Sequence, residues 1–229
     1  MSLAGKRIAI TGAVGSLGTA VVQAALAEGA KVAAIDRADA PTTGSGSGAV
    51  QWFGGVDLAD TAQAKTAIDA AARALGGLDA LVNIAGTFRY ETLADGSPET
   101  FDLLYRINLR TAVAASKAAL AHIPQGGRIV NIGAASGLKA GAGVGAYTAS
   151  KSGVMRFTEA LAEELKARDI TVNALLPSII DTPPNRRDMP KADFGRWVKP
   201  EQLADVITFL LSDRATAITG ALIPVTGRV

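Results

Sequence analysis

The stretch "TGAVGSLG", residues 11–18, decides the fold of this chain of 229 residues. It follows an apolar run, "KRIAI" (6–10), whose length and composition predict a β-strand. It opens a segment, 16–28, in which apolar residues recur at spacings of three and four, as they do in a buried helix. Gly29 then ends that helix as a left-handed cap would. The sequence therefore predicts a strand, a tight glycine turn and a helix in direct succession.

The same alternation of short apolar runs and helical stretches continues along the chain. Further strands are predicted at 31–36, 50–53, 79–83, 127–132, 170–176 and 221–225. Further helices are predicted at 60–75, 98–121, 147–168 and 200–211. This order indicates the α/β class, with a doubly wound, Rossmann-type parallel sheet of about seven strands, helices on both faces, and a ligand crevice at the strands' carboxyl ends. The segment "PTTGSGSG" (41–48) is interpreted as a flexible loop too short to separate domains, so 1–229 is expected to form a single domain.

Composition excludes several classes of function. The net charge is only +2 and basic residues are scattered among acidic ones, so no stripe suited to nucleic acid is present. The absence of cysteine excludes disulfides and thiolate metal sites, and the single His122 is expected to end a helix, so no metal site is predicted. Residues 8–27 carry no charge, but their glycine turn argues against a membrane span and no signal peptide is evident. We expect a soluble, cytoplasmic protein.

Two features of the first half of the chain indicate a dinucleotide cofactor. A glycine turn between a strand and a helix lets backbone approach a pyrophosphate, which the N–H groups and dipole of the helix favour. Asp36 ends the second strand 18 residues after Gly18, close to the interval of about 20 expected for an acid that binds the adenosine ribose. A carboxylate there would repel a 2′-phosphate, so NAD(H) is predicted as the preferred cofactor. Arg37 could pair with that phosphate, which keeps NADP(H) as the alternative.

A third feature, "AYTASK" (146–151), places a phenol beside an ammonium. Tyr147 and Lys151 are four residues apart and would share one face of a helix. A nearby positive charge favours phenolate, so we expect Lys151 to lower the pKa of Tyr147 and make it a usable proton donor and acceptor.

With "LVNIAG" (81–86) added, these motifs make the chain similar to the short-chain dehydrogenase/reductase family over essentially its whole length. The resemblance implies that Tyr147 is the general acid/base, that Lys151 lowers its pKa and grips the nicotinamide ribose, and that Asn108 holds a water in the proton path. Asp57 would approach the adenine, and "LLPSIIDT" (175–182) would contact the nicotinamide. The cofactor residues implied in this way are Gly12, Gly15, Ser16, Leu17, Gly18, Asp36, Arg37, Asp57, Leu58, Asn83, Ala85, Gly86, Tyr147, Lys151, Pro177, Ile179 and Thr182.

The chain departs from the family pattern at two places. Ala134 stands where the family usually has a substrate-orienting serine, with Ser136 two residues later. The middle glycine of the turn is Gly15, and Ser16 occupies its usual position. Both departures, together with "IDTPPNRRDMPKADFGRW" (180–197), resemble the quinonoid dihydropteridine reductase branch. Residues assigned to the substrate side on this basis are Ala134, Phe88, Asn185, Met189 and Trp197, with a substrate loop at about 183–198.

Three functions remain open on the sequence alone. The first is a reductase of a small quinonoid substrate that uses Tyr147 and Lys151. The second is a carbonyl or alcohol oxidoreductase of the 3-oxoacyl reductase type, in which Ser136 or a water replaces the missing serine. The third is a non-catalytic dinucleotide-binding redox sensor, which the presence of Asn108 argues against. Helices 98–121 and 147–168 are apolar on more than one face, so we expect a homodimer or homotetramer.

Overall fold

The computed structural model describes residues 3–39 and 50–229, and the predicted loop at 41–48 lies outside them. A seven-stranded, entirely parallel sheet crosses the molecule in the order β3-β2-β1-β4-β5-β6-β7. Its strands are β1 (Arg7–Thr11), β2 (Lys31–Ile35), β3 (Val50–Phe53), β4 (Ala80–Asn83), β5 (Arg128–Ile132), β6 (Thr171–Pro177) and β7 (Leu222–Val225). The predicted α/β class and doubly wound sheet are confirmed, and every strand lies within one residue of its predicted bounds at each end.

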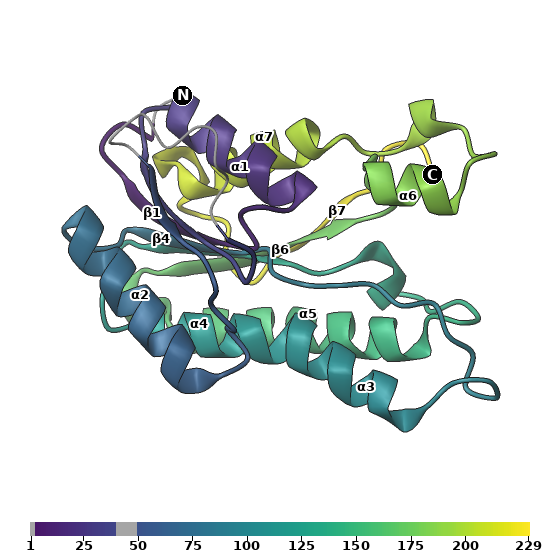
Figure 1. Cartoon of the computed structure of the whole chain (residues 1–229). Helices are drawn as coiled ribbons and strands as arrows, with labels where there is room; N and C mark the ends of the chain where they lie inside the picture. The colour runs from purple at the N-terminus through teal and green to yellow at the C-terminus, as the bar shows by residue number, and fades with distance from the viewer. Residues whose placement is uncertain (1–2, 40–49) are drawn as a thin grey trace.

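Helices cover both faces of the sheet (Figure 1). The α-helices are α1 (Ser16–Ala27), α2 (Thr61–Leu75), α3 (Pro98–Leu104), α4 (Thr111–Ala119), α5 (Gly145–Glu164), α6 (Pro183–Asp188) and α7 (Pro200–Leu211). Helices α1 and α7 lie on one face and contribute to one apolar core cluster, whereas α2, α4 and α5 form the second cluster on the other face. No helix of the described segments is both long and apolar enough to cross a membrane.

The predicted helix at 98–121 differs most from the structure. It is divided into α3 and α4 by a π-helical turn, η1 (Tyr105–Arg110). Such turns are rare and are found mostly as single insertions, often at functional sites. The apolar spacing of three and four does not reveal the turn, because one extra residue per turn changes the pattern only locally. Helix α6 was not predicted, since the expectation for that segment was a loop.

The glycine turn joins β1 to α1 by close backbone approach. Gly12 has φ +66°, a conformation that disfavours side chains, and a Cβ there would lie 2.7 Å from the Ala85 backbone nitrogen. A Cβ on Gly18 would clash with the Gly12 carbonyl oxygen and lie 2.7 Å from Ala13 Cα. Gly15 differs, because a Cβ there would meet no protein atom closer than 3.4 Å. Packing therefore requires two of the three glycines.

Substituting these glycines should separate packing from ligand approach. Gly18→Ala should lower the free energy of unfolding by about 1–3 kcal/mol, because the added methyl overpacks the turn. Gly15→Ala is the matched control and should leave the melting temperature nearly unchanged. Thermal unfolding followed by circular dichroism checks both. Equal losses in the two variants would contradict this account of the turn.

Candidate active site

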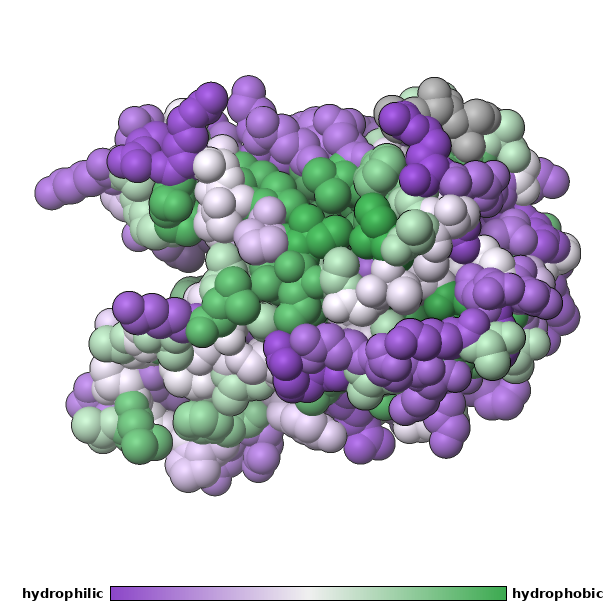
Figure 2. All heavy atoms as spheres, turned by 180° about the vertical axis from the view of Figure 1, so that it is seen from behind, coloured by the Kyte–Doolittle hydropathy of each residue, from purple (hydrophilic) through white to green (hydrophobic). Residues whose placement is uncertain are grey.

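A cavity of about 810 Å³ lies at the carboxyl ends of the strands, where the crevice was predicted. It is lined by Gly12, Val14, Gly15, Ser16, Leu17, Gly18, Asp36, Arg37, Ala38, Val56, Asp57, Leu58, Ile84, Ala85, Gly86, Thr87, Arg89, Leu103, Ile107, Thr111, Ile132, Gly133, Tyr147, Lys151, Pro177, Ser178, Ile180 and Thr182. Seen from behind, the molecule is hollowed between the side that carries α6 and the side that carries α3, and apolar side chains gather around the hollow (Figure 2). The cavity therefore brings most of the predicted cofactor residues together with the tyrosine–lysine pair.

The glycine end of the cavity suits an anion. Helix α1 begins at Ser16 with Gly15 as its N-cap, and glycine has no side chain that could accept a hydrogen bond from the N–H groups of the first turn. Unfilled N–H groups and the positive end of the helix dipole favour a phosphate. Protein packing does not require glycine at position 15. A glycine there instead leaves space for a ligand to approach the backbone. These residues fit the pyrophosphate of a dinucleotide.

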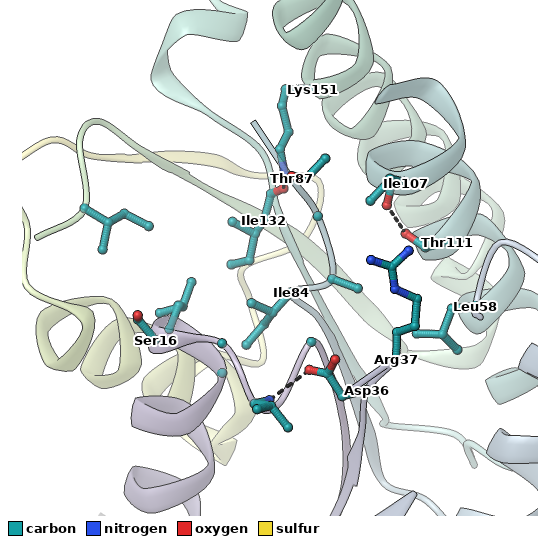
Figure 3. Close-up of a pocket in the computed structure, with 18 of the residues that line it drawn as sticks. Ser16, Asp36, Arg37, Leu58, Ile84, Thr87, Ile107, Thr111, Ile132 and Lys151 are labelled. Atoms are coloured by element: carbon teal, nitrogen blue, oxygen red, sulfur yellow. Dashed lines mark hydrogen bonds between the residues drawn. The ribbon is translucent and has the colours of Figure 1, made fainter. Parts of the chain in front are cut away.

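Asp36 lies where an adenosine ribose would be bound. Its Oδ2 accepts a hydrogen bond from the Val14 backbone N–H at 2.9 Å, and its Oδ1 accepts one from Ala38 at 3.0 Å. These bonds fix the carboxylate, and each oxygen keeps a further lone pair for a ligand hydroxyl. Figure 3 shows Arg37 extending away from the Asp36 carboxylate toward Thr111. The side chains of Asp36 and Arg37 thus point into different parts of the cavity.

Asp57 and Leu58 also line the cavity, as predicted. The carboxylate of Asp57, however, already has protein partners: Oδ2 pairs with Arg106 Nη2 at 2.6 Å, and Oδ1 accepts from the Ala59 backbone N–H at 3.0 Å. The side chain of Asp57 is therefore held by η1 as well as by its own loop.

The predicted catalytic pair, Tyr147 and Lys151, lies on α5, one helical turn apart. Lys151 is 5% exposed and its Nζ donates to the Ile132 carbonyl oxygen at 2.8 Å. Burial lowers the pKa of Lys151 to about 8 and raises the pKa of Tyr147 to about 12. The expectation that Lys151 lowers the pKa of the phenol is wrong for this structure, because desolvation dominates. Tyr147 is therefore held as a neutral phenol at neutral pH.

Asn108 reaches this region from η1 and is 2% exposed. Its Oδ1 accepts from the Thr87 backbone N–H at 2.7 Å, and its Nδ2 donates to Ser150 Oγ at 2.9 Å. Asn108 does not line the cavity itself. Its side chain instead links the loop after β4 to α5.

Two of the predicted substrate residues, Phe88 and Ala134, are apolar, and neither lines the cavity. The ring of Phe88 meets the ring of Tyr147 edge-on, with centroids 4.9 Å apart, and Phe88 is 49% exposed. Ala134 is buried just after β5, at the start of a 3₁₀ turn (Ala135–Gly137) that contains Ser136. Position 134 therefore presents a buried methyl group, where the family usually has a serine hydroxyl.

Polar side chains at the start of the loop at 183–198 bond to residues of the same loop and to those just before it. Thr182 caps α6, and Asn185 Nδ2 donates to the Ile180 carbonyl oxygen at 2.7 Å. Arg186 forms a two-point ion pair with Asp181 and lies over the ring of Phe194. Trp197, predicted as a substrate residue, is 6% exposed, packs against that same ring and does not line the cavity. The side chain of Asn185 is likewise engaged in holding the loop, and Met189 does not line the cavity.

Two predicted cofactor residues are not among those that line the cavity. Asn83 is buried, and its Nδ2 donates to Asn131 Oδ1 at 2.8 Å and to Ser116 Oγ at 3.0 Å, so it ties the sheet to α4. Ile179 is also absent from the lining, although its neighbours Ser178 and Ile180 are present.

Sequence reasoning missed lining residues of two kinds. Apolar ones, such as Ile107 and Ile132, are indistinguishable from core residues in the sequence. Others, such as Thr87 and Gly133, directly follow a predicted turn or strand end, and the rule that ligands bind beyond the strands' carboxyl ends could have found them. Within residues 3–39 and 50–229, no group of three acidic or histidine side chains could hold a metal ion.

Comparison with known proteins identifies the family. A family model described as enoyl-(acyl carrier protein) reductase (adh_short_C2) matches residues 12–227. The chain is 34% identical over 242 residues to 2-(S)-hydroxypropyl-CoM dehydrogenase 3 of Xanthobacter autotrophicus, covering 96% of this chain and 94% of that protein.

Solved structures agree with this comparison. A 3-ketoacyl-(acyl-carrier-protein) reductase from Brucella melitensis complexed with NADH has a TM-score of 0.87 at 29% identity and covers 99% and 98% of the two chains. A blue fluorescent protein from a metagenomic library, in complex with NADPH, has a TM-score of 0.86 at 31% identity and covers 100% and 99%. The chain belongs to the short-chain dehydrogenase/reductase family of oxidoreductases.

Proposed function

We propose that this protein is a nicotinamide-dependent oxidoreductase that reduces a small substrate with Tyr147 as its proton donor. The observation that carries the proposal is the shared cavity, which Tyr147 and Lys151 line together with the glycine turn and Asp36. A binding protein alone would have no need of an acid–base pair at the far end of the same cavity.

Each end of the cavity has a task under this proposal. The first turn of α1, from Gly15 and Ser16, holds the pyrophosphate, and Asp36 accepts the hydroxyls of the adenosine ribose. When bound, the nicotinamide supplies a hydride. Lys151 holds the nicotinamide ribose, and Tyr147, kept protonated by its burial, gives its proton to the substrate. Pro177 and Thr182 line the cavity at the nicotinamide end.

Replacing Tyr147 by Phe tests the proposal directly. The variant should lose about two to four orders of magnitude in turnover, because general acid catalysis is removed. Binding of NADH should remain nearly intact, since the ring fills the same space. Steady-state kinetics and titration calorimetry measure the two effects. Turnover above half of the wild-type rate would mean that the proton comes from another group, and a wild type that binds NADH without any turnover would favour the redox-sensor alternative.

We also propose NADH as the preferred cofactor. The Asp36 carboxylate is fixed by two backbone N–H groups on the ribose side of the cavity, and a 2′-phosphate placed against it would be repelled. Arg37, the residue next to Asp36, is a cation that could offset that repulsion, but it extends away from Asp36 (Figure 3). Structural relatives in complex with NADH and with NADPH leave both cofactors open for the family.

Titration calorimetry should give a lower Kd for NADH than for NADPH. Asp36→Asn should reduce that preference, because it removes the repulsion and keeps the shape of the side chain. Arg37→Ala should leave NADH binding nearly unchanged and weaken NADPH binding further. Comparable dissociation constants for the two cofactors in the wild type would show that Arg37 dominates the choice.

The first candidate substrate class is a quinonoid acceptor such as quinonoid dihydropterin. Ala134 provides no hydroxyl where the family usually has a donor for a carbonyl oxygen. A quinonoid ring is already activated and spreads developing charge over several atoms, so it depends less on one fixed donor. The exposed ring of Phe88 beside Tyr147 also suits a flat substrate.

The second candidate class is a simple carbonyl or alcohol, favoured by the 3-ketoacyl reductase and the hydroxypropyl-CoM dehydrogenase among the relatives. In that case Ser136 or a water would replace the missing hydroxyl.

A substrate panel with two variants should distinguish the classes. We expect NADH oxidation to be faster with quinonoid dihydropterin, or another quinonoid acceptor, than with any simple ketone. Ala134→Ser should raise ketone reduction more than quinonoid reduction, since a fixed donor is worth about two to three orders of magnitude for an oxyanion. Rapid ketone reduction by the wild type that is lost in Ser136→Ala, with no activity on the pterin, would establish the carbonyl class instead.

We finally propose that the protein assembles as a homodimer or homotetramer. Phe101, Leu103, Tyr105 and Val113 are each more than a third exposed along α3, η1 and α4. Exposed large apolar side chains on adjacent turns are typical of a face that another subunit covers. Multi-angle light scattering at micromolar concentration should give two or four times the mass of one chain. A single-chain mass would contradict the proposal.

A further inference from the structure

A continuous chain of hydrogen bonds joins the loop after β4 to the catalytic turn of α5. The Thr87 backbone N–H donates to Asn108 Oδ1 at 2.7 Å, and Asn108 Nδ2 donates to Ser150 Oγ at 2.9 Å. Ser150 Oγ in turn donates to the carbonyl oxygen of Tyr147 at 2.7 Å. Asn108 is 2% exposed and Ser150 4%, so water hardly competes for these bonds. The chain therefore ends on the backbone of the catalytic tyrosine.

The direction of these bonds is fixed by Ser150. A serine hydroxyl has one hydrogen, and Ser150 uses it on the Tyr147 carbonyl oxygen, so toward Asn108 it can only accept. Asn108 must therefore present its NH₂ group to Ser150 and its oxygen to Thr87. A reversed amide would set Nδ2 against the Thr87 N–H and Oδ1 against the lone pairs of Ser150. The Ser150 hydroxyl and the Thr87 N–H together thus decide which way the buried amide faces.

The orientation of Asn108 matters because its oxygen lies close to the catalytic lysine. The point that a Cβ on Gly86 would occupy is 2.9 Å from Asn108 Oδ1 and 3.3 Å from Lys151 Nζ. The two polar atoms therefore converge on the same small space, which residue 86 leaves open because it is glycine. An amide oxygen there favours the charged lysine, whereas an NH₂ group would oppose it.

We propose that Ser150 is a positioning residue for the reaction: it holds the Asn108 amide so that the oxygen, and not the nitrogen, faces the Lys151 ammonium. Ser150 does not line the cavity, so it acts through Asn108 and not on the substrate. The inference rests on the proposed function of the same site, since it assigns Lys151 its catalytic role.

Ser150→Ala is the first test. It leaves Asn108 Nδ2 buried without an acceptor and removes one of the two bonds that hold the amide in place, so kcat should fall about 10- to 100-fold. The Kd of NADH should change by less than about threefold. Ser150→Thr keeps a hydroxyl and should restore most of the lost kcat. Retention of more than half of the wild-type kcat in Ser150→Ala would overturn the proposal.

Ser152→Ala is the matched control. Ser152 lies on the same helix, is partly buried, and donates a comparable hydrogen bond to the Gly137 carbonyl oxygen at 2.9 Å. Its removal costs the helix a similar bond without touching Asn108, so kcat should stay within about twofold of wild type. Equal losses in the two alanine variants would mean that a general disturbance of α5 explains the effect, and would overturn the proposal.

A double-mutant cycle then tests whether Ser150 acts through Asn108. If it does, Ser150→Ala combined with Asn108→Ala should be no slower than Asn108→Ala alone. Fully additive losses would show that Ser150 acts by another route.

Hydrogen–deuterium exchange gives a readout that does not depend on turnover. The peptide that contains Thr87 should exchange at least about tenfold faster in Ser150→Ala than in wild type or Ser152→Ala, because the acceptor of the Thr87 N–H is no longer held. If Ser150→Ala does not fold, Ser150→Cys, whose thiol is a weaker acceptor, takes its place. A wild type that turns over no substrate would refute the proposed function alone, and unchanged exchange at Thr87 would still refute the role of Ser150.

Discussion

The close approach of Gly18 to the Gly12 carbonyl oxygen is the constraint on which the rest of the site depends. It lets α1 begin directly above the end of β1, so that the N–H groups of its first turn face the crevice. Gly12 in turn lies against the backbone at Ala85, at the end of β4. Because β4 is the point at which the chain passes to the other half of the sheet, this contact joins the half that carries the glycine turn to the half that carries Tyr147 and Lys151. A side chain at Gly12 would push the two halves apart, and one at Gly18 would push α1 away from the end of β1.

Burial, more than the nearness of the two groups to each other, sets the pKa values of Tyr147 and Lys151. Lys151 is buried on α5 with its ammonium directed at the end of β5, and Tyr147 is partly buried beside Phe88. Both groups are therefore pushed toward their neutral forms in the free protein. A neutral phenol is the form that a proton donor needs. A bound ligand that brings further polar groups into the cavity would act on a pair already held in place.

The sequence predicted the frame of the molecule well, because strand composition and helical spacing are local properties. The glycine turn, Asp36 and the pair on α5 could be placed because chain order alone brings the ends of parallel strands together. Asn83 and Trp197 were predicted as site residues but do not line the cavity, for a different reason. A motif names the residue type at a position, but whether that side chain faces the cavity or a neighbouring element depends on packing far along the chain, such as Asn131 on β5 or the ring of Phe194. Lining residues such as Ile132 could not be told from core residues for the same reason.

The π-helical turn makes the segment Tyr105–Arg110 sensitive to insertions and deletions but tolerant of substitutions at its outward-facing positions. A π-turn is in effect an α-helix with one residue inserted, and here the extra residue directs Asn108 inward while Tyr105 and Arg106 remain outside. Exchange of the outward side chains changes little in the interior. Loss of a single residue anywhere in the turn would restore regular winding and rotate everything that follows by about 100° about the helix axis. Natural variation in this segment should therefore appear as substitutions, with insertions and deletions confined to the loops on either side.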